Sequence, residues 1–124
     1  MTSEIFLVID DDPQVANLFS EAFKANGFRG DVYIDSFEAL SVFNKSPNKY
    51  RVVICDIRMP GKSGIEAATE IKKLNPSVKV VLMSDDKKDY DNSDSPSKIS
   101  DHFVIKPKEV GEVVKLMSGL DTAH

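Results

Sequence analysis

Short apolar runs alternate along this chain with amphipathic helical patterns, and this alternation limits the possible folds more than any other feature. The first run, at residues 4–9, is apolar at nearly every position, as in a strand that is buried on both faces. After it, Asp12-Pro13 is a helix N-cap candidate followed by a proline suited to the first helical position. Apolar residues then recur at helical spacing as far as Asn26-Gly27, which ends the predicted helix: they are Val15, Leu18, Phe19, Ala22 and Phe23.

The same unit of strand and helix recurs through the rest of the sequence. Further strands are predicted at about residues 31–35, at 52–55, at 78–83 and at 103–105. Ser36 is the expected cap of the second helix, the third helix ends near residues 75–76, and a last helix follows Pro107. These successive units predict an α/β domain with a doubly wound, five-stranded parallel sheet and helices on both of its faces.

Residues 84–101 depart from this pattern. The stretch contains six aspartates and three lysines, but only Tyr90 and Ile99 as large apolar residues. A helix formed here can bury little apolar surface, so we expect the fourth helix to be short, irregular or mobile.

Charge and composition exclude several classes of protein. The net charge of −4 at pH 7 disfavours direct binding to nucleic acid or to an anionic membrane surface, because both need a basic patch. The N-terminus lacks the basic start and apolar stretch of a signal peptide, and no apolar run approaches the roughly 18 residues of a membrane span. We therefore expect a single cytoplasmic domain over residues 1–124.

Polar residues follow four of the predicted strands, at the carboxyl ends where doubly wound sheets form their sites. The residues at these strand ends are Asp10-Asp11-Asp12, Asp56, Ser84 and Lys106. One such residue alone is often only a helix cap or a structural hydroxyl, and we assign Asp12 to capping. Their convergence at one edge of one sheet favours a functional site.

The charges at this edge predict a metal ion. Asp10, Asp11 and Asp56 carry three negative charges against the single positive charge of Lys106, and carboxylates packed so closely raise one another's pKa. Mg²⁺ or Mn²⁺ would compensate the excess, since a hard divalent cation prefers oxygen ligands. One carboxylate can then attack phosphorus and form an aspartyl phosphate, while the metal, the lysine and a hydroxyl hold the phosphoryl oxygens.

Four sequence motifs carry a family resemblance. They are Val8-Ile9-Asp10-Asp11, residues 53–61, Val80-Val81-Leu82-Met83-Ser84, and residues 103–107. In this order they resemble the receiver domain of two-component response regulators, the CheY-like superfamily, over essentially the full length of the chain. The resemblance implies a flavodoxin-like sheet in the order 2-1-3-4-5 and a phosphoacceptor regulator rather than an enzyme.

The resemblance also implies a role for each residue of the acidic motifs. Asp56 resembles the phosphoacceptor. Asp11 resembles the direct metal ligand, Asp10 holds a water of the metal, and the backbone carbonyl of Arg58 completes the protein ligands.

Further roles follow from the resemblance for the later motifs. Ser84 matches the hydroxyl that turns toward the phosphoryl group, and Lys106 matches the cation of the family. Phe103 matches the aromatic position that turns inward when this hydroxyl moves. A sensor histidine kinase or a phosphotransfer protein is the implied phosphoryl source. A downstream protein target would bind the face formed by residues 85–120, and no output domain is expected within residues 1–124.

The sequence departs from the family at positions that modulate the site. Asp85 stands where alanine or glycine is usual in the family, so it slows phosphorylation, tunes the site to an unusual partner, or simply turns to solvent. Arg58 and Asp86 occupy the variable positions beside the phosphoryl group, where they could pair and shield it from water. A weak fourth helix would give Phe103 a loose wall and make switching an order–disorder transition.

Two other functions stay open at this point. A pseudo-receiver would keep the fold and act as a protein-binding module without phosphorylation, which Asp85 and the weak fourth helix favour. A small aspartate-dependent phosphatase of the haloacid dehalogenase type is less favoured, because such enzymes place a second aspartate two residues after the first, where this chain has Arg58.

Overall fold

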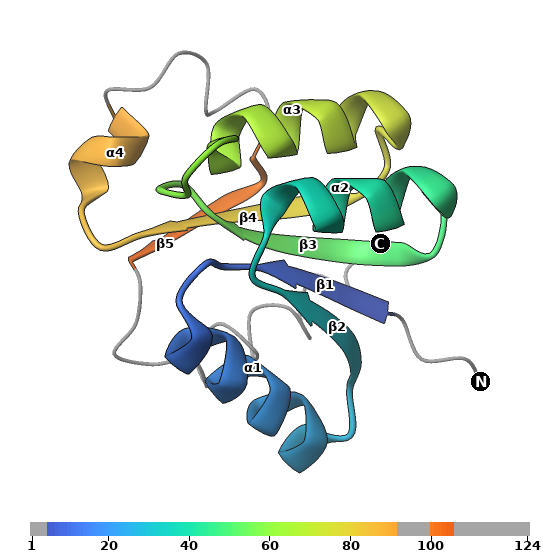
Figure 1. The fold of residues 1–124 in the computed structure, drawn as a ribbon. Coiled ribbons are helices and arrows are strands. Elements are labelled where there is room, and N and C mark those ends of the chain that lie inside the picture. Colours follow the sequence, from blue (N-terminus) through green and yellow to red (C-terminus); the bar gives the residue numbers. More distant parts are fainter. Residues whose placement is uncertain (1–4, 92–99, 106–124) are drawn as a thin grey trace.

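The computed structural model describes residues 5–91 and 100–105, which form a layered α/β structure (Figure 1). The strands are β1 (Ile5–Ile9), β2 (Arg29–Tyr33), β3 (Tyr50–Asp56), β4 (Lys79–Ser84) and β5 (His102–Ile105). The helices are α1 (Pro13–Asn26), α2 (Ser36–Lys45), α3 (Gly64–Leu74) and α4 (Lys87–Asp91). All neighbouring strands are parallel, in the order β2-β1-β3-β4-β5, so the predicted fold class and strand order are confirmed.

The helices cover both faces of the sheet (Figure 1). Helix α1 lies on one face, while α2 and α3 pack side by side on the other. Because alternate side chains of a strand point to opposite faces, Phe6 and Val8 pack with the aromatic residues of α1, and Leu7 and Ile9 pack with the apolar residues of α2 and α3. The central strands are therefore buried on both sides, as their continuous apolar sequence predicts.

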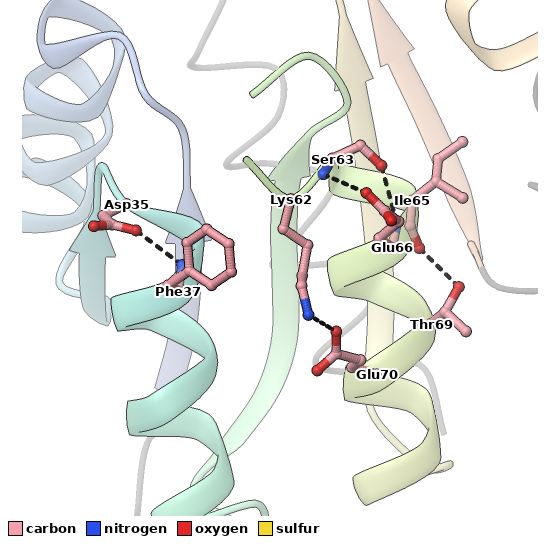
Figure 2. A network of polar contacts seen from close by, with 8 residues as sticks. All are labelled: Asp35, Phe37, Lys62, Ser63, Ile65, Glu66, Thr69 and Glu70. Atoms are coloured by element: carbon pink, nitrogen blue, oxygen red, sulfur yellow. Dashed lines mark hydrogen bonds and ion pairs between the residues drawn. The ribbon is translucent and has the colours of Figure 1, made fainter. Parts of the chain in front are cut away.

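Side-chain caps determine where the helices begin. The Asp12 carboxylate accepts a hydrogen bond from the Gln14 amide at 2.9 Å, so its assignment to capping is confirmed. Asp35, not Ser36, caps α2 by accepting from the Phe37 amide at 2.9 Å (Figure 2). Helix α3 begins with a capping box in which the Glu66 amide donates to Ser63 and the Ser63 amide donates to the Glu66 carboxylate (Figure 2).

Pairing with β1 moves β2 from its expected position. The strand covers Arg29–Tyr33 rather than residues 31–35, because the register pairs Ile5 with Arg29 and Ile9 with Tyr33. The carboxyl ends of β1 and β2 are thereby aligned, and Ile34 is left exposed in the connection to α2.

The end of the fold is only partly described. Helix α4 begins shortly after β4 and is described as far as Asp91, while residues 92–99 of the segment with the expected weak helix lie outside the described residues. Lys106 and the expected last helix lie outside the described residues, and so does most of the expected partner face at residues 85–120. No helix in residues 5–91 and 100–105 is long and apolar enough to span a membrane.

The connection from β3 to α3 closes on itself at Gly64. The Gly64 amide donates to the Ile57 carbonyl at 2.9 Å, and a Cβ atom at position 64 would lie 2.1 Å from the Asp56 carbonyl oxygen. Backbone cannot move aside as a flexible side chain can. Glycine at this position therefore keeps the start of α3 against the end of β3.

Replacing Gly64 should destabilise the fold through this clash. We expect Gly64→Ala to lower the free energy of unfolding by about 2 kcal/mol or more, measured by urea denaturation. Gly27→Asn is the matched control, because Gly27 has a φ of 72° with nothing within 4 Å of an added Cβ, and asparagine tolerates this conformation. Equal urea midpoints for Gly64→Ala and the wild type would contradict the role of this corner.

Candidate functional site

Three carboxylates meet at the carboxyl edge of the sheet. Asp10, Asp11 and Asp56 each offer an oxygen within 4.8 Å of those of the other two. Asp10 and Asp56 are buried, at 0% and 3% exposure, whereas Asp11 is exposed. The structure thus brings together the acidic residues that the sequence places at the ends of the first and third strands.

Backbone pairing beyond the strands holds these residues in place. The Asp10 amide donates to the Tyr33 carbonyl at 3.0 Å, and the Ile57 amide donates to the Met83 carbonyl at 2.8 Å. The hydrogen bonds between strands therefore continue past the last residues of β1 and β3. The backbone at Asp10 and next to Asp56 is thus held by the neighbouring strand. The Asp12 amide also donates to the Asp10 carboxylate at 3.0 Å, which orients that side chain within the turn to α1.

The donor set fits a hard divalent cation. The cluster supplies carboxylate oxygens, which Mg²⁺ and Mn²⁺ prefer as ligands. Because Asp11 is exposed, water can reach the site and supply further ligands. Negative charges that are partly buried and this close repel one another unless a cation compensates them. Arg58, whose carbonyl is the further expected ligand, lies in the connection that the hydrogen bond between Gly64 and Ile57 closes.

Ser84 ends β4 beside this cluster. It is fully buried, and its register partner is Ile105, the last described residue before Lys106. The Ser84 oxygen accepts a hydrogen bond from the Asp86 amide at 3.2 Å, and its hydroxyl donates to the Asp89 carboxylate in a short contact. The predicted hydroxyl therefore already has a partner in this state of the protein.

Arg58 pairs with Asp89 and not with Asp86, so the expected pair was wrong. The Arg58 Nε and Nη2 atoms lie 2.7 and 2.8 Å from the two Asp89 carboxylate oxygens. Asp86 instead accepts from the Lys88 amide at 2.9 Å at the start of α4, and Asp89, three residues later, contacts both Arg58 and Ser84. The hydrogen bonds from Arg58 and then from Ser84 lower the pKa of Asp89, and the same bond to Asp89 raises the pKa of Arg58.

Asp89 is the residue that sequence reasoning missed. It is one of six aspartates in residues 84–101, and none of the family motifs includes it. The only available signal was its spacing of three residues from Asp86, which places both on one face if a helix forms there.

Two further predicted positions, Asp85 and Phe103, lie directly after β4 and within β5. Asp85 is exposed, which agrees with its solvent-facing alternative, and its effect on phosphorylation stays a prediction. Phe103 is partly buried and packs against the core on the side of α2 and α3, while its switching role also stays a prediction.

Cys55 directly precedes Asp56 and points to the other face of the sheet. It is fully buried in the core cluster that packs under α2 and α3, with its sulfur 3.6 Å from the Asp56 carbonyl oxygen. Burial, followed by the charges of Asp56 and Asp10, raises the pKa of the Cys55 thiol far above its ordinary value. Both effects disfavour the thiolate form.

A hollow of about 430 Å³ opens beside the exposed member of the cluster. Asp11 lines it together with residues from the start of α2 and from the connection after β3, namely Ile34, Asp35, Ser36, Phe37, Met59, Pro60 and Gly61. Phe37 is 57% exposed, so its ring forms an apolar border close to the acidic site.

Comparison with known proteins agrees with this geometry. The family model described as "Response regulator receiver domain" matches residues 6–118. An uncharacterized transcriptional regulatory protein, YbdJ of Bacillus subtilis, is 26% identical over 118 residues, which are 95% of this chain and 51% of that protein. The CpxR homolog of Haemophilus influenzae is 33% identical over 68% of this chain and 36% of its own length. The chain thus spans about half or less of the length of these curated relatives.

Solved structures resemble the chain over nearly its whole length. The response regulator TrrA from Thermotoga maritima, crystallised in complex with Mg²⁺ and beryllium fluoride, is 32% identical, with a TM-score of 0.82 over 94% of this chain and 98% of TrrA. TrrA in complex with the histidine kinase ThkA is 33% identical, with a TM-score of 0.78 over 94% of this chain and 97% of that one. With the family model matching most of its residues, the chain belongs to the response regulator receiver domain family.

Proposed function

We propose that Asp56 accepts a phosphoryl group and that the chain acts as a phosphorylation switch in two-component signal transduction. The observation that carries this proposal is the convergence of Asp10, Asp11 and Asp56 within 4.8 Å, in a chain of the receiver family. Mg²⁺ or Mn²⁺ would be held by these three carboxylates and by the backbone carbonyl of Arg58. The complex of the similar protein TrrA with Mg²⁺ and beryllium fluoride supports this assignment.

The proposed reaction is transfer between a phosphohistidine and a carboxylate. An Asp56 oxygen attacks phosphorus, the P–N bond of the donor breaks, and the leaving imidazole keeps the electron pair and takes a proton. The bound cation supplies charge compensation for the phosphoryl oxygens. Ser84 and Lys106 hold the other oxygens, and hydrolysis of the aspartyl phosphate later restores Asp56. The chain itself is the substrate, so we assign it no turnover of external phosphate esters.

The proposed donor is a sensor histidine kinase or a phosphotransfer protein. The complex of TrrA with a histidine kinase supports a kinase partner for this similar chain. The apolar border formed by Phe37 beside Asp11 gives a donor protein a surface next to the acidic cluster. A downstream protein would read the change through residues 85–120, in the cytoplasm, with Phe103 turning inward as Ser84 moves.

Phosphorylation should be directly measurable by intact mass. With phosphoramidate and Mg²⁺, the wild type should gain the mass of one phosphoryl group, whereas Asp56→Asn and a sample with excess chelator should gain none. Glu38→Gln, an exposed charge change on α2, is the matched control and should react like the wild type. A wild type that stays unmodified would favour the pseudo-receiver, which the engagement of Ser84 by Asp89 also favours.

Metal binding should be visible in stability without any phosphodonor. Without divalent ions, Asp10→Asn should raise the free energy of unfolding by about 1 kcal/mol, because it removes one of three repelling charges while its Oδ1 still accepts from the Asp12 amide. Millimolar Mg²⁺ should raise the melting temperature of the wild type, since a ligand that binds only the folded state stabilises it. The variant should lose this response. An equal Mg²⁺ response in both proteins would contradict the assignment.

A further inference from the structure

The Ser84 hydroxyl is fully committed in this structure. A serine hydroxyl has one proton, and Ser84 donates it to Asp89 while its oxygen accepts from the Asp86 amide at 3.2 Å. The same proton cannot be donated at once to a phosphoryl oxygen on Asp56. Engagement of Ser84 by Asp89 and engagement by a phosphoryl group therefore exclude each other.

Arg58 is held by the same carboxylate. Its Nε and Nη2 atoms form a fork around Asp89, at 2.7 and 2.8 Å. The Asp89 side chain is only 15% exposed, whereas that of Arg58 is 66% exposed, so the arginine reaches over from the connection after β3 to cover the acid. One carboxylate thus joins the end of β4, helix α4 and the connection that follows the acceptor strand.

The Asp89 carboxylate resembles the phosphoryl group that would form on Asp56. It is an anion with two acceptor oxygens, and it binds the hydroxyl of Ser84, which follows the register partner of Asp56, and the guanidinium of Arg58, two residues after Asp56. It also adds a negative charge close to a site that an anionic phosphoryl group must enter. Both effects favour the unphosphorylated state.

We propose that Asp89 is a positioning residue that occupies Ser84 and Arg58 in place of the phosphoryl group, so that phosphorylation has to displace it. This inference rests on the proposed function of Asp56. Displacement of Asp89 would free α4 from the end of β4, which links the chemistry at Asp56 to the start of the proposed partner face. Breaking the contact by mutation should therefore make phosphorylation easier and not harder.

Initial rates of phosphorylation by phosphoramidate and Mg²⁺ test this directly. Asp89→Asn removes the charge but keeps the shape, and we expect a rate roughly threefold to tenfold above that of the wild type. Asp89→Ala, which removes both acceptor oxygens, should shift the rate in the same direction and further. Glu38→Gln, with the same loss of charge on α2, should match the wild type. A purely structural role for Asp89 would leave the rate unchanged or lower it.

A double variant identifies the group through which Asp89 acts. In a Ser84→Ala background the gain from Asp89→Asn should shrink, because no hydroxyl remains to be released, and only the share that comes from Arg58 and from the removed charge should stay. The apparent dissociation constant for beryllium fluoride with Mg²⁺, measured by calorimetry, should fall in Asp89→Asn by a similar factor.

The outcomes separate this inference from the proposed function. A wild type that is phosphorylated while Asp89→Asn and Asp89→Ala react no faster would overturn the inference alone. A gain that persists fully in the Ser84→Ala background would also overturn it. If neither the wild type nor the Asp89 variants take up a phosphoryl group, the proposed function fails and this inference fails with it.

Discussion

The rest of the site depends on one constraint: the sheet holds Asp10, Asp11 and Asp56 close together although their negative charges repel one another. Asp10 and Asp56 sit at the ends of adjacent strands whose backbone pairing continues past both residues, so neither can retreat into solvent. Folding therefore accumulates negative charge in a small partly buried space, against its own electrostatic preference. A cation and then a phosphoryl group are the chemical responses that such an arrangement favours.

The contacts around Ser84 extend this constraint to the neighbouring helix. Asp89 adds a carboxylate at the end of β4, where it pairs with Arg58 and accepts a hydrogen bond from Ser84. Helix α4 has few apolar residues with which to hold itself against the sheet, so polar contacts of this kind carry more of its attachment than they would in a well-packed helix. The proposed chemistry at Asp56 and the position of α4 would thereby depend on the same donors, Ser84 and Arg58.

The hydrophobic periodicity predicted the order of the elements and the parallel sheet, because strands that are buried on both faces have continuous apolar sequences. It also predicted the strand ends that carry Asp10, Asp56 and Ser84, since sites of doubly wound sheets form at the carboxyl ends of the strands. The prediction of Ser36 as the cap of α2 was wrong, since Asp35 caps the helix and both side chains are of types that can accept from a nearby amide. The position of β2 depended on register with β1, which no local pattern encodes. Asp89 stayed hidden because its partners lie on two other segments, and only the folded chain brings them together.

The burial of Cys55 has a consequence for signalling under oxidative stress. Oxidants such as hydrogen peroxide react with exposed thiolates, whereas this sulfur is enclosed in the core and burial raises the pKa of its thiol, although Cys55 directly precedes the proposed acceptor Asp56. A sulfenic acid or a mixed disulfide at this position would distort the acceptor strand from within. By burying this thiol, the fold would insulate the proposed phosphoryl chemistry at Asp56 from the redox state of its surroundings.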